Sequence, residues 1–239
     1  MELWQEFQEN FIFVLVCAGI MVALSVLAHL SERFLLKQRR QLSPARRVSI
    51  IGICGAIATV LHILDFPLVF LAPEFYKLDF SELPVLLCGF YLGPSATVAC
   101  EGIKILLKLI LNGTSTAFVG DFANFAVGCS LVLPATLIYH LRKSKKSAIW
   151  GMVAGTAVLT VFGSAFNAVY LLPKFAQLYG MPLDTIVSLG TAIFPAVRDV
   201  SSFVLLCVAP LNLIKGVSVS LLTLLLYKRL ERICFPKQR

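Results

Sequence analysis

Apolar runs dominate the chain, and their lengths predict membrane-spanning helices. A helix needs about 20 consecutive apolar residues to cross the hydrocarbon core of a bilayer, and the chain lacks the short alternating segments that are typical of membrane barrels. We therefore expect an all-α integral membrane protein, because helices satisfy their own backbone groups in lipid. The predicted spans are Phe11–Leu30, Val48–Leu64, Pro84–Leu92 (a short one), Ser95–Leu111, Asp121–Leu141, Ala148–Leu172 and Leu211–Tyr227.

Two apolar segments are harder to interpret. Ile193–Ala209 contains Pro195, Arg198 and Asp199 and is closed by Pro210, so we expect it to fold back at one surface rather than to span. The first run follows an acidic leader, "MELWQEFQEN", and precedes a heavily charged loop without a small-residue cleavage site. We interpret it as a retained helix rather than a secretory signal.

The composition supports a membrane protein without metal chemistry. The 239 residues are 58% hydrophobic and 14% charged, with a mean hydropathy of +0.86, whereas a soluble domain is about half apolar and about a quarter charged. The 7 cysteines are scattered without a Cys-x-x-Cys pair, and His29, His62 and His140 lie far apart. We therefore expect neither a disulfide framework nor a metal site.

Positive charge is concentrated in three segments. Fifteen of the 21 Lys and Arg residues fall in "ERFLLKQRRQLSPARRVS", "RKSKKS" and "KRLERICFPKQR". Because basic loops remain on the cytoplasmic side, they predict an extracellular N-terminus and a cytoplasmic C-terminus, and the net charge of +8 reflects topology rather than nucleic-acid binding. The predicted organisation is an N-terminal transmembrane helix with a basic linker (1–47), a membrane domain (48–232) and a cytoplasmic tail (233–239).

Polar residues inside the spans are candidate site residues. Lys215 and Asn212 lie three residues apart, so they share a helix face and suggest a polar pocket; the alternative is a lysine that reaches the headgroups. Asn167 lies near the outer end of its span, with Tyr170 three residues later, and its amide both donates and accepts. The alternative for Asn167 is an interhelical hydrogen bond.

The segment "VGDFANFAVG" adds three residues near a helix start. Asn124 lies between two phenylalanines, and Asp121 is expected to be an N-cap and first-turn acid. Gly120 is either a turn residue or a point at which the backbone approaches a ligand.

Two further patterns concern packing. Glu101, Lys104 and Lys108 fall on one face of their span, and we expect them to form internal ion pairs. Gly52 and Ala56 have the spacing of small residues that allows close helix packing, either within the protein or against a separate subunit.

Enzymatic functions are not supported. Ser164 in "FGSAF" lacks the second glycine of a nucleophile elbow. No glycine-rich loop ends in Gly-Lys-Ser, so the chain is not expected to hydrolyse ATP itself.

Four stretches carry a resemblance to a known family: "FPLVFLAPEFYKLDFSELPVLLCGFYLGP", "GTSTAFVGDFANFAVG", "FNAVYLLP" and "APLNLIKG". They occur in the family's order within Val48–Tyr227, and the chain resembles the riboflavin-specific S component of energy-coupling factor (ECF) transporters. The resemblance implies a six-helix S-component bundle, here with one extra N-terminal transmembrane helix. It also implies an outward-opening vitamin site, a transmembrane coupling protein and two cytoplasmic ATPase subunits as partners, and a location in the cell membrane.

The same resemblance implies a set of contacts. The ligand-binding residues it selects are Leu78, Asp79, Gly120, Asn124, Asn167, Asn212 and Lys215, and we expect Phe80 and Tyr170 to pack on the faces of the ligand's ring system. Riboflavin would be the transported ligand, with no cofactor and no catalytic residue, and Gly52 and Ala56 would contact the coupling protein. The stretch "YKLDFSELP" would form an outer lid, in which Asp79 and Ser81 cap the helix that Pro84 begins; the alternative is a plain connector.

The expected function is capture of riboflavin outside the cell and its delivery with an ATPase and coupling module. The alternatives are an S component for another flavin or heterocyclic vitamin, and a membrane scaffold without a transport role. A phosphorylated flavin would require basic groups near the outer mouth, where Lys77 and Lys174 are the obvious candidates.

Overall fold

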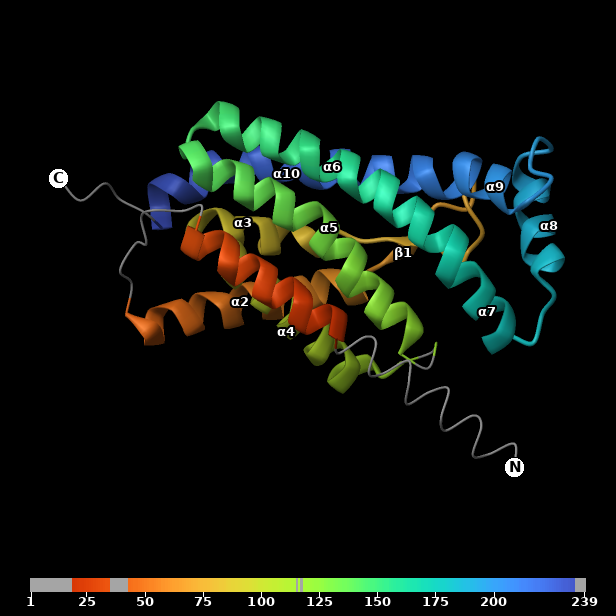
Figure 1. Cartoon of the computed structure of the whole chain (residues 1–239), viewed down its shortest axis with the longest axis horizontal. Coiled ribbons are helices and arrows are strands. Elements are labelled where there is room, and N and C mark those ends of the chain that lie inside the picture. Colours follow the sequence, from red (N-terminus) through yellow and green to blue (C-terminus); the bar gives the residue numbers. More distant parts are fainter. Residues whose placement is uncertain (1–18, 35–42, 115, 117, 235–239) are drawn as a thin grey trace.

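The computed structural model describes residues 19–34, 43–114, 116 and 118–234, with the side chains of 228–234 excepted, and it is mainly helical (Figure 1). A helix over residues 19–34 is followed by α2 (Pro44–Ile63), α3 (Glu82–Leu92), α4 (Pro94–Asn112), α5 (Val119–Arg142) and α6 (Lys145–Phe166). The chain continues with η1 (Asn167–Leu171), α7 (Leu172–Leu178), α8 (Leu183–Ile193), α9 (Val200–Phe203), η2 (Val204–Val208) and α10 (Ala209–Cys234). The segments η1 and η2 are single π-helical turns.

Long apolar helices confirm the predicted fold class. Within the described residues, four helices are long and apolar enough to cross a membrane: Pro44–Ile63, Val119–Arg142, Lys145–Leu178 and Val200–Tyr227. The first part of the predicted span Phe11–Leu30 lies outside the described residues, as do residues 235–239 of the predicted tail.

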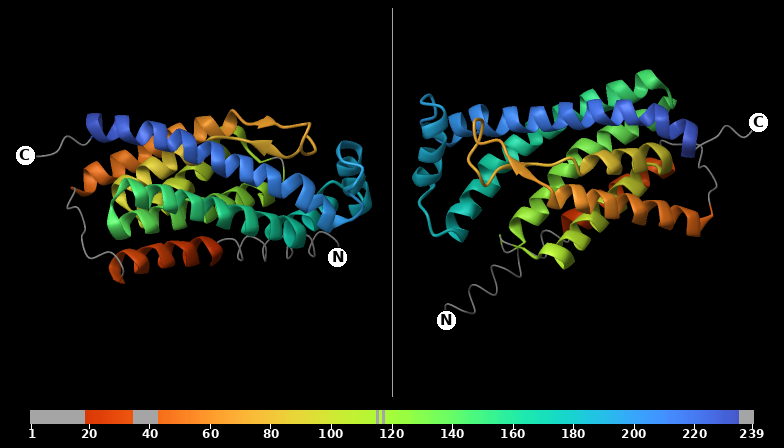
Figure 2. Two further views of the ribbon diagram at one scale, coloured as in Figure 1. Left: turned by 90° about the horizontal axis from the view of Figure 1, so that it is seen from above. Right: turned by 180° about the vertical axis from the view of Figure 1, so that it is seen from behind.

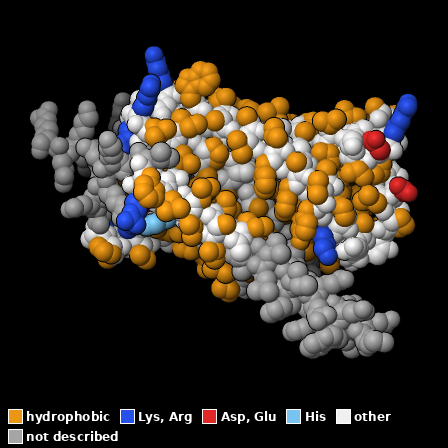
Figure 3. All heavy atoms as spheres, viewed as in Figure 1, with side chains coloured by type: hydrophobic (Ala, Val, Ile, Leu, Met, Phe, Trp, Pro, Cys, Tyr) orange, Lys and Arg blue, Asp and Glu red, His pale blue; other side chains and the backbone are white. Residues whose placement is uncertain are grey.

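The bundle is elongated, and its two ends differ (Figure 1). We call the end formed by the start of α2 and the turns α3–α4 and α5–α6 the basic end. The opposite end, formed by α7 to α9 and by the connection between α2 and α3, is called the connection end. On the face shown in Figure 3, most of the visible Lys and Arg lie at the basic end, the visible Asp and Glu lie at the connection end together with further basic side chains, and apolar side chains cover the middle.

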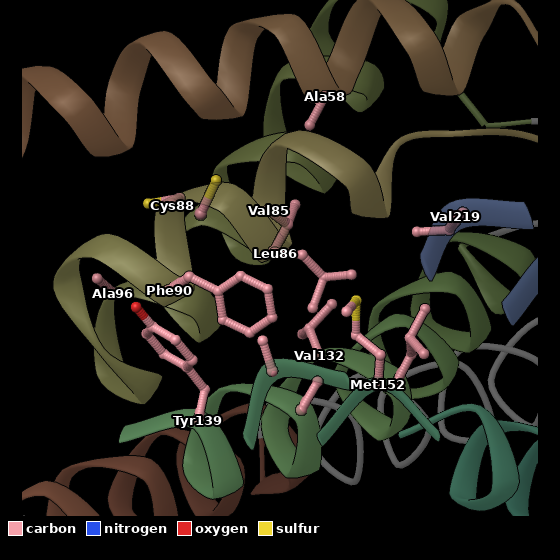
Figure 4. Close-up of a cluster of buried hydrophobic side chains, with 14 of the residues drawn as sticks. Ala58, Val85, Leu86, Cys88, Phe90, Ala96, Val132, Tyr139, Met152 and Val219 are labelled. Carbon is pink, nitrogen blue, oxygen red and sulfur yellow. The ribbon is translucent and has the colours of Figure 1, made fainter. Parts of the chain in front are cut away.

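Apolar packing and close backbone contacts hold the bundle together. Figure 4 shows side chains of the main core, among them Leu86, Phe90 and Met152, which point toward one another from α3 and α6. Helices α5 and α6 approach most closely at the "GMVAG" stretch, where a Cβ on Gly151 would lie 2.5 Å from the carbonyl oxygen of Ala135. Small residues four apart, here Gly151 and Gly155, allow this approach. The sequence analysis had not singled out these two glycines.

The helix over residues 19–34 covers the face formed by α4 and α5. Figure 2 shows it on the outside of the bundle, where its Ala28 packs with Val98 and Phe125. Its buried Glu32 accepts a hydrogen bond of 2.8 Å from the backbone N–H of Ser95. The carboxylate thereby caps the start of α4, where a glycine occupies the N-cap position and has no side chain to do so.

Two prolines that were expected to end helices lie inside continuous ones. The predicted span ending at Leu172 runs on through Pro173 to Leu178, and the segment predicted not to span belongs, from Val200 onward, to one helix that passes Pro210. Both predictions were therefore wrong.

The π-helical turns explain how these prolines fit. The N–H of Leu172 donates to the carbonyl of Asn167, and the N–H of Ala209 donates to that of Val204, five residues back in each case. A proline normally clashes with the carbonyl four residues before it. Each π-helical turn ends two residues before a proline and relieves that clash.

Two predicted caps are also corrected. Helix α3 begins two residues before Pro84, which lies in its first turn, and the N-cap residue Ser81 makes no side-chain cap bond. Asp79 instead accepts the backbone N–H of Ser81 at 2.8 Å. Asp121 is an acid of the first turn of α5, as expected, but it is not the N-cap.

Candidate ligand-binding site

The connection between α2 and α3 folds onto the connection end of the bundle. It contains a short antiparallel ribbon in which β1 (Phe66–Pro67) pairs with β2 (Lys77–Leu78). An ion pair of 3.0 Å between Lys77 and Asp65 also links the two sides of the ribbon. Leu71 and Ala72 are buried among apolar side chains of α7 to α10. The predicted lid begins shortly after this stretch, and its first residue, Tyr76, packs against the same apolar cluster.

Asn167 ties this connection to α6. The hydroxyl of Tyr76 donates to Oδ1 of Asn167 at 2.8 Å, and Nδ2 of Asn167 donates to the carbonyl of Gly163 at 2.7 Å. Both edges of the buried amide are engaged, and one of them holds a residue of the predicted lid. Asn167 is the first residue of η1, so this π-helical turn sets the position of its amide.

Asn212 of α10 lies against the same turn of α6. A Cβ on Gly163 would lie 2.8 Å from Nδ2 of Asn212, so this glycine places Asn212 close to the carbonyl that Asn167 uses. Asn212 is buried, yet its Nδ2 has no hydrogen-bond partner within the described part of the chain. A buried unpaired amide costs about 1–3 kcal/mol, so this group is suited to an acceptor that the protein does not supply.

Lys215 lies one turn farther along α10 and is buried rather than extended to the surface. Its Nζ is 2.9 Å from Oδ2 of Asp79 and 3.0 Å from Oε1 of Glu82. An ammonium group has three N–H donors, so one remains after these two contacts. Two of the predicted ligand residues, Lys215 and Asp79, thus form an ion pair with each other.

The charge of Asp79 is strongly stabilised. Burial by itself raises the pKa of the Asp79 carboxyl, but the groups around it, foremost the ammonium of Lys215, hold that pKa well below its ordinary value; the imidazole of His62 lies 3.4 Å away. Asp79 therefore acts as a fixed anion that anchors the connection to α10.

The α5 residues face the same interior. Gly120, Asn124 and Gly128 are spaced by four residues, so they share one helix face, and Gly128 lies against the carboxylates of Glu101 and Glu82. Asn124 donates to the carbonyl of Gly120 at 3.3 Å. Asn124 therefore lies one turn of α5 away from Gly128 and the buried carboxylates that Gly128 contacts.

The two predicted aromatic contacts lie on different elements. Tyr170 stacks on Phe166 with centroids 5.3 Å apart and packs near Val119 at the start of α5. Phe80 follows the buried Leu78 of the ribbon and contacts the ring of Phe66, with centroids 6.1 Å apart.

A pocket of about 700 Å³ lies beside this region, between the connection and the α7–α8 segment. Its lining residues are Val69, Ala72, Pro73, Glu74, Phe75, Phe175, Tyr179, Met181, Ile186, Leu189 and Ile193. None of the nine predicted ligand residues is among them. The pocket is therefore adjacent to the predicted site and separate from it.

The sequence had not identified several features of the site. Tyr76, His62 and Glu82 hold predicted residues in place, but no spacing rule connects them to partners so far along the chain. The π-helical turns at Asn167 and before Asn212 do have a sequence signal, namely a proline within each apolar run. Such turns are frequent at functional sites.

Comparisons with known proteins agree with the family resemblance seen in the sequence. Residues 46–227 match the family model of the ECF transporter substrate-specific component. The chain is similar to Riboflavin transporter RibU of Staphylococcus aureus (strain TCH60), with 34% identity over 194 residues (81% of this chain, 95% of the relative). It is also similar to Riboflavin transporter FmnP of Bacillus subtilis (strain 168), with 29% identity over 187 residues (78% and 92%).

A solved structure described as the S component of a bacterial ECF transporter has a similar fold. Its TM-score is 0.62 at 36% sequence identity, and the match covers 80% of this chain and 98% of that one. The named relatives are transporters and not enzymes. The chain therefore belongs to the family of substrate-specific components of ECF transporters.

Proposed function

We propose that this chain is the riboflavin-binding subunit of an ECF transporter, which captures the vitamin on the extracellular side and delivers it with an ATPase and coupling module. The named relatives are riboflavin transporters. The polar groups that the resemblance selects for a flavin come from the connection, α6 and α10, and they converge at one end of the bundle.

The observation that carries this proposal is the buried, unpaired amide of Asn212. Riboflavin has an apolar ring system with carbonyl and nitrogen acceptors at one edge. The Nδ2 of Asn212 and the remaining N–H of Lys215 would donate to such acceptors, while Leu78, Phe80 and Tyr170 would supply apolar contacts. Gly120 and Asn124 would border the ligand from α5.

The test is a riboflavin titration of the detergent-purified protein, followed by quenching of flavin fluorescence. The wild-type protein should bind saturably, and Asn212→Leu should weaken binding by roughly 1–3 kcal/mol, or about 5- to 150-fold in Kd. Asn112→Leu, at an exposed asparagine near the end of α4, is the matched control and should bind as the wild type does. Equal affinity of Asn212→Leu and wild type would remove Asn212 from the site.

Competition identifies the ligand class. Lys77 is paired with Asp65, and Lys174 donates to Gln177, so the two basic candidates for a phosphate are already engaged. Riboflavin should therefore compete better than flavin mononucleotide. Stronger competition by another heterocyclic vitamin would favour the alternative S component.

The orientation and the partners are also part of the proposal. The basic end would face the cytoplasm, because basic loops remain there, with the N-terminus outside and the C-terminus inside. A C-terminal tag should then bind its antibody only after right-side-out vesicles are permeabilised. Gly52 and Ala56 would contact the coupling protein; a Cβ on Gly52 would meet nothing within 4 Å, and Ala56 is exposed.

A further inference from the structure

A chain of buried charged groups joins α10, the connection between α2 and α3, α3 itself and α4. Lys215 of α10 contacts Asp79 of the connection and Glu82 of α3, at 2.9 and 3.0 Å. Glu82 is shared with Lys104 of α4, at 3.3 Å, and Lys104 also contacts Glu101 at 2.5 Å. Together with His62 near Asp79, we call these six residues the charge cluster.

The charge cluster does not balance if every acid is ionised. It contains three carboxylates, two ammonium groups and one imidazole, so its net charge is −1 when His62 is neutral. All six side chains are buried, and an uncompensated charge in such surroundings is costly. Within the described residues, no group of three or more His, Cys, Asp or Glu is arranged to hold a metal ion.

Three polar atoms of the charge cluster lack a hydrogen-bond partner in the described part of the chain, namely Oε2 of Glu82, Oε2 of Glu101 and Nδ1 of His62. A carboxylate with a free oxygen in an apolar interior is better stabilised as an acid than as an anion. The unpaired atoms therefore point to a proton as the bound species.

Glu101 is the least compensated carboxylate. Asp79 has the ammonium of Lys215 and the backbone N–H of Ser81, and Glu82 contacts both lysines. Glu101, which is 0% exposed, forms an ion pair only with Lys104 among the described residues and shares that lysine with Glu82.

We propose that Glu101 binds one proton and is a neutral carboxylic acid in the folded protein, so that the charge cluster as a whole is neutral. The charged or titratable groups that face Glu101 are Lys104 on α4, Glu82 on α3, Lys215 on α10 and Cys129 on α5. Gly128 of α5 lets the carboxyl group lie against that helix, which shields it from further partners.

Because of this charge balance, the protonation of Glu101 depends on the position of the connection between α2 and α3. When Asp79 is withdrawn from the cluster, two carboxylates and two ammonium groups remain, and these balance without the added proton. Movement of the connection away from Lys215 would therefore release the proton from Glu101, and its return would take one up. This consequence rests on the proposed lid, whereas the protonation of Glu101 does not.

The proton can be observed directly by infrared spectroscopy of the detergent-purified full chain at neutral pH. The C=O stretching band of a protonated, buried carboxyl group should be present in the wild-type protein. It should be lost in Glu101→Gln and retained in Glu74→Gln, the control at an exposed glutamate. A wild-type spectrum without this band, as expected if His62 holds the proton, would overturn the proposal, and so would a band that persists in Glu101→Gln.

A second variant tests the charge balance without touching Glu101. Asp79→Asn removes one negative charge, so Glu101 should ionise and the band should disappear although its residue is intact. Persistence of the band in Asp79→Asn would contradict the coupling. Failure of Glu101→Gln to fold would also count against the proposal, because glutamine imitates the neutral acid. These measurements need no riboflavin, so their outcome is independent of the titration that tests the proposed function.

Discussion

At the scale of single residues, removal of Lys215 and removal of Asn212 should have opposite effects on the stability of the protein. Lys215→Met leaves the buried carboxylates of Asp79 and Glu82 without their shared cation, which should destabilise the protein by about 3–5 kcal/mol. Asn212→Leu removes an amide that has no partner within the described residues, so stability should be unchanged or improved. Unfolding in detergent measures both effects.

The double variant Lys215→Met with Asp79→Asn provides the control. Because it removes both members of the ion pair, it should recover part of the stability that Lys215→Met loses. Equal stability of Lys215→Met and wild type would show that the pair contributes little to the fold.

The sequence identified these residues but not their partners. A lysine or asparagine inside an apolar run is visible by polarity alone, and this argument found Lys215, Asn212 and Asn167. Their contacts join positions 136 residues apart, as for Lys215 and Asp79, or 91 residues apart, as for Asn167 and Tyr76. No local spacing predicts such pairs, so Lys215 was expected to address a ligand without the ion pair that holds it.

At the scale of helices, the π-helical turns should matter for binding more than for folding. Pro173→Ala and Pro210→Ala remove the ring that opposes a regular helix, so each turn should tighten and shift Asn167 or Asn212 relative to its neighbours. We expect higher thermal stability together with weaker riboflavin binding. Pro134→Ala is the matched control, because Pro134 lies inside α5 without a π-helical turn; it should leave binding unchanged.

The same prolines show why helix boundaries were predicted only in part. Helix starts agreed within a few residues where local signals act, as with Ser43 before α2 and Ser144 before α6. The predicted boundaries at Leu172 and Pro210 failed, because each helix continues past its proline through a π-helical turn. A local rule cannot anticipate this, because the compensating contacts come from distant segments.

At the scale of the whole molecule, hydropathy and charge predicted the architecture well because each acts over an entire segment. The apolar spans became the long helices, and most of the Lys and Arg seen in Figure 3 lie at the end opposite to the visible Asp and Glu. The position of the N-terminal helix was not predictable in this way. Glu32 and the apolar residues around Ala28 dock it on α4 and α5, which leaves the outer face of α2 uncovered by it.

This uncovered face of α2 leads to a prediction about coupling. Gly52 has open space around its Cβ position and Ala56 is exposed, whereas Gly55 on the neighbouring face is buried and packs against Ile103. Ala56→Trp places a bulky ring on the open face, so it should abolish riboflavin uptake by cells while the purified protein binds riboflavin normally. Val161→Trp, at an exposed position of α6, should retain both properties. Loss of binding in Ala56→Trp would mean that the face belongs to the fold, and normal uptake would mean that the coupling protein contacts another surface.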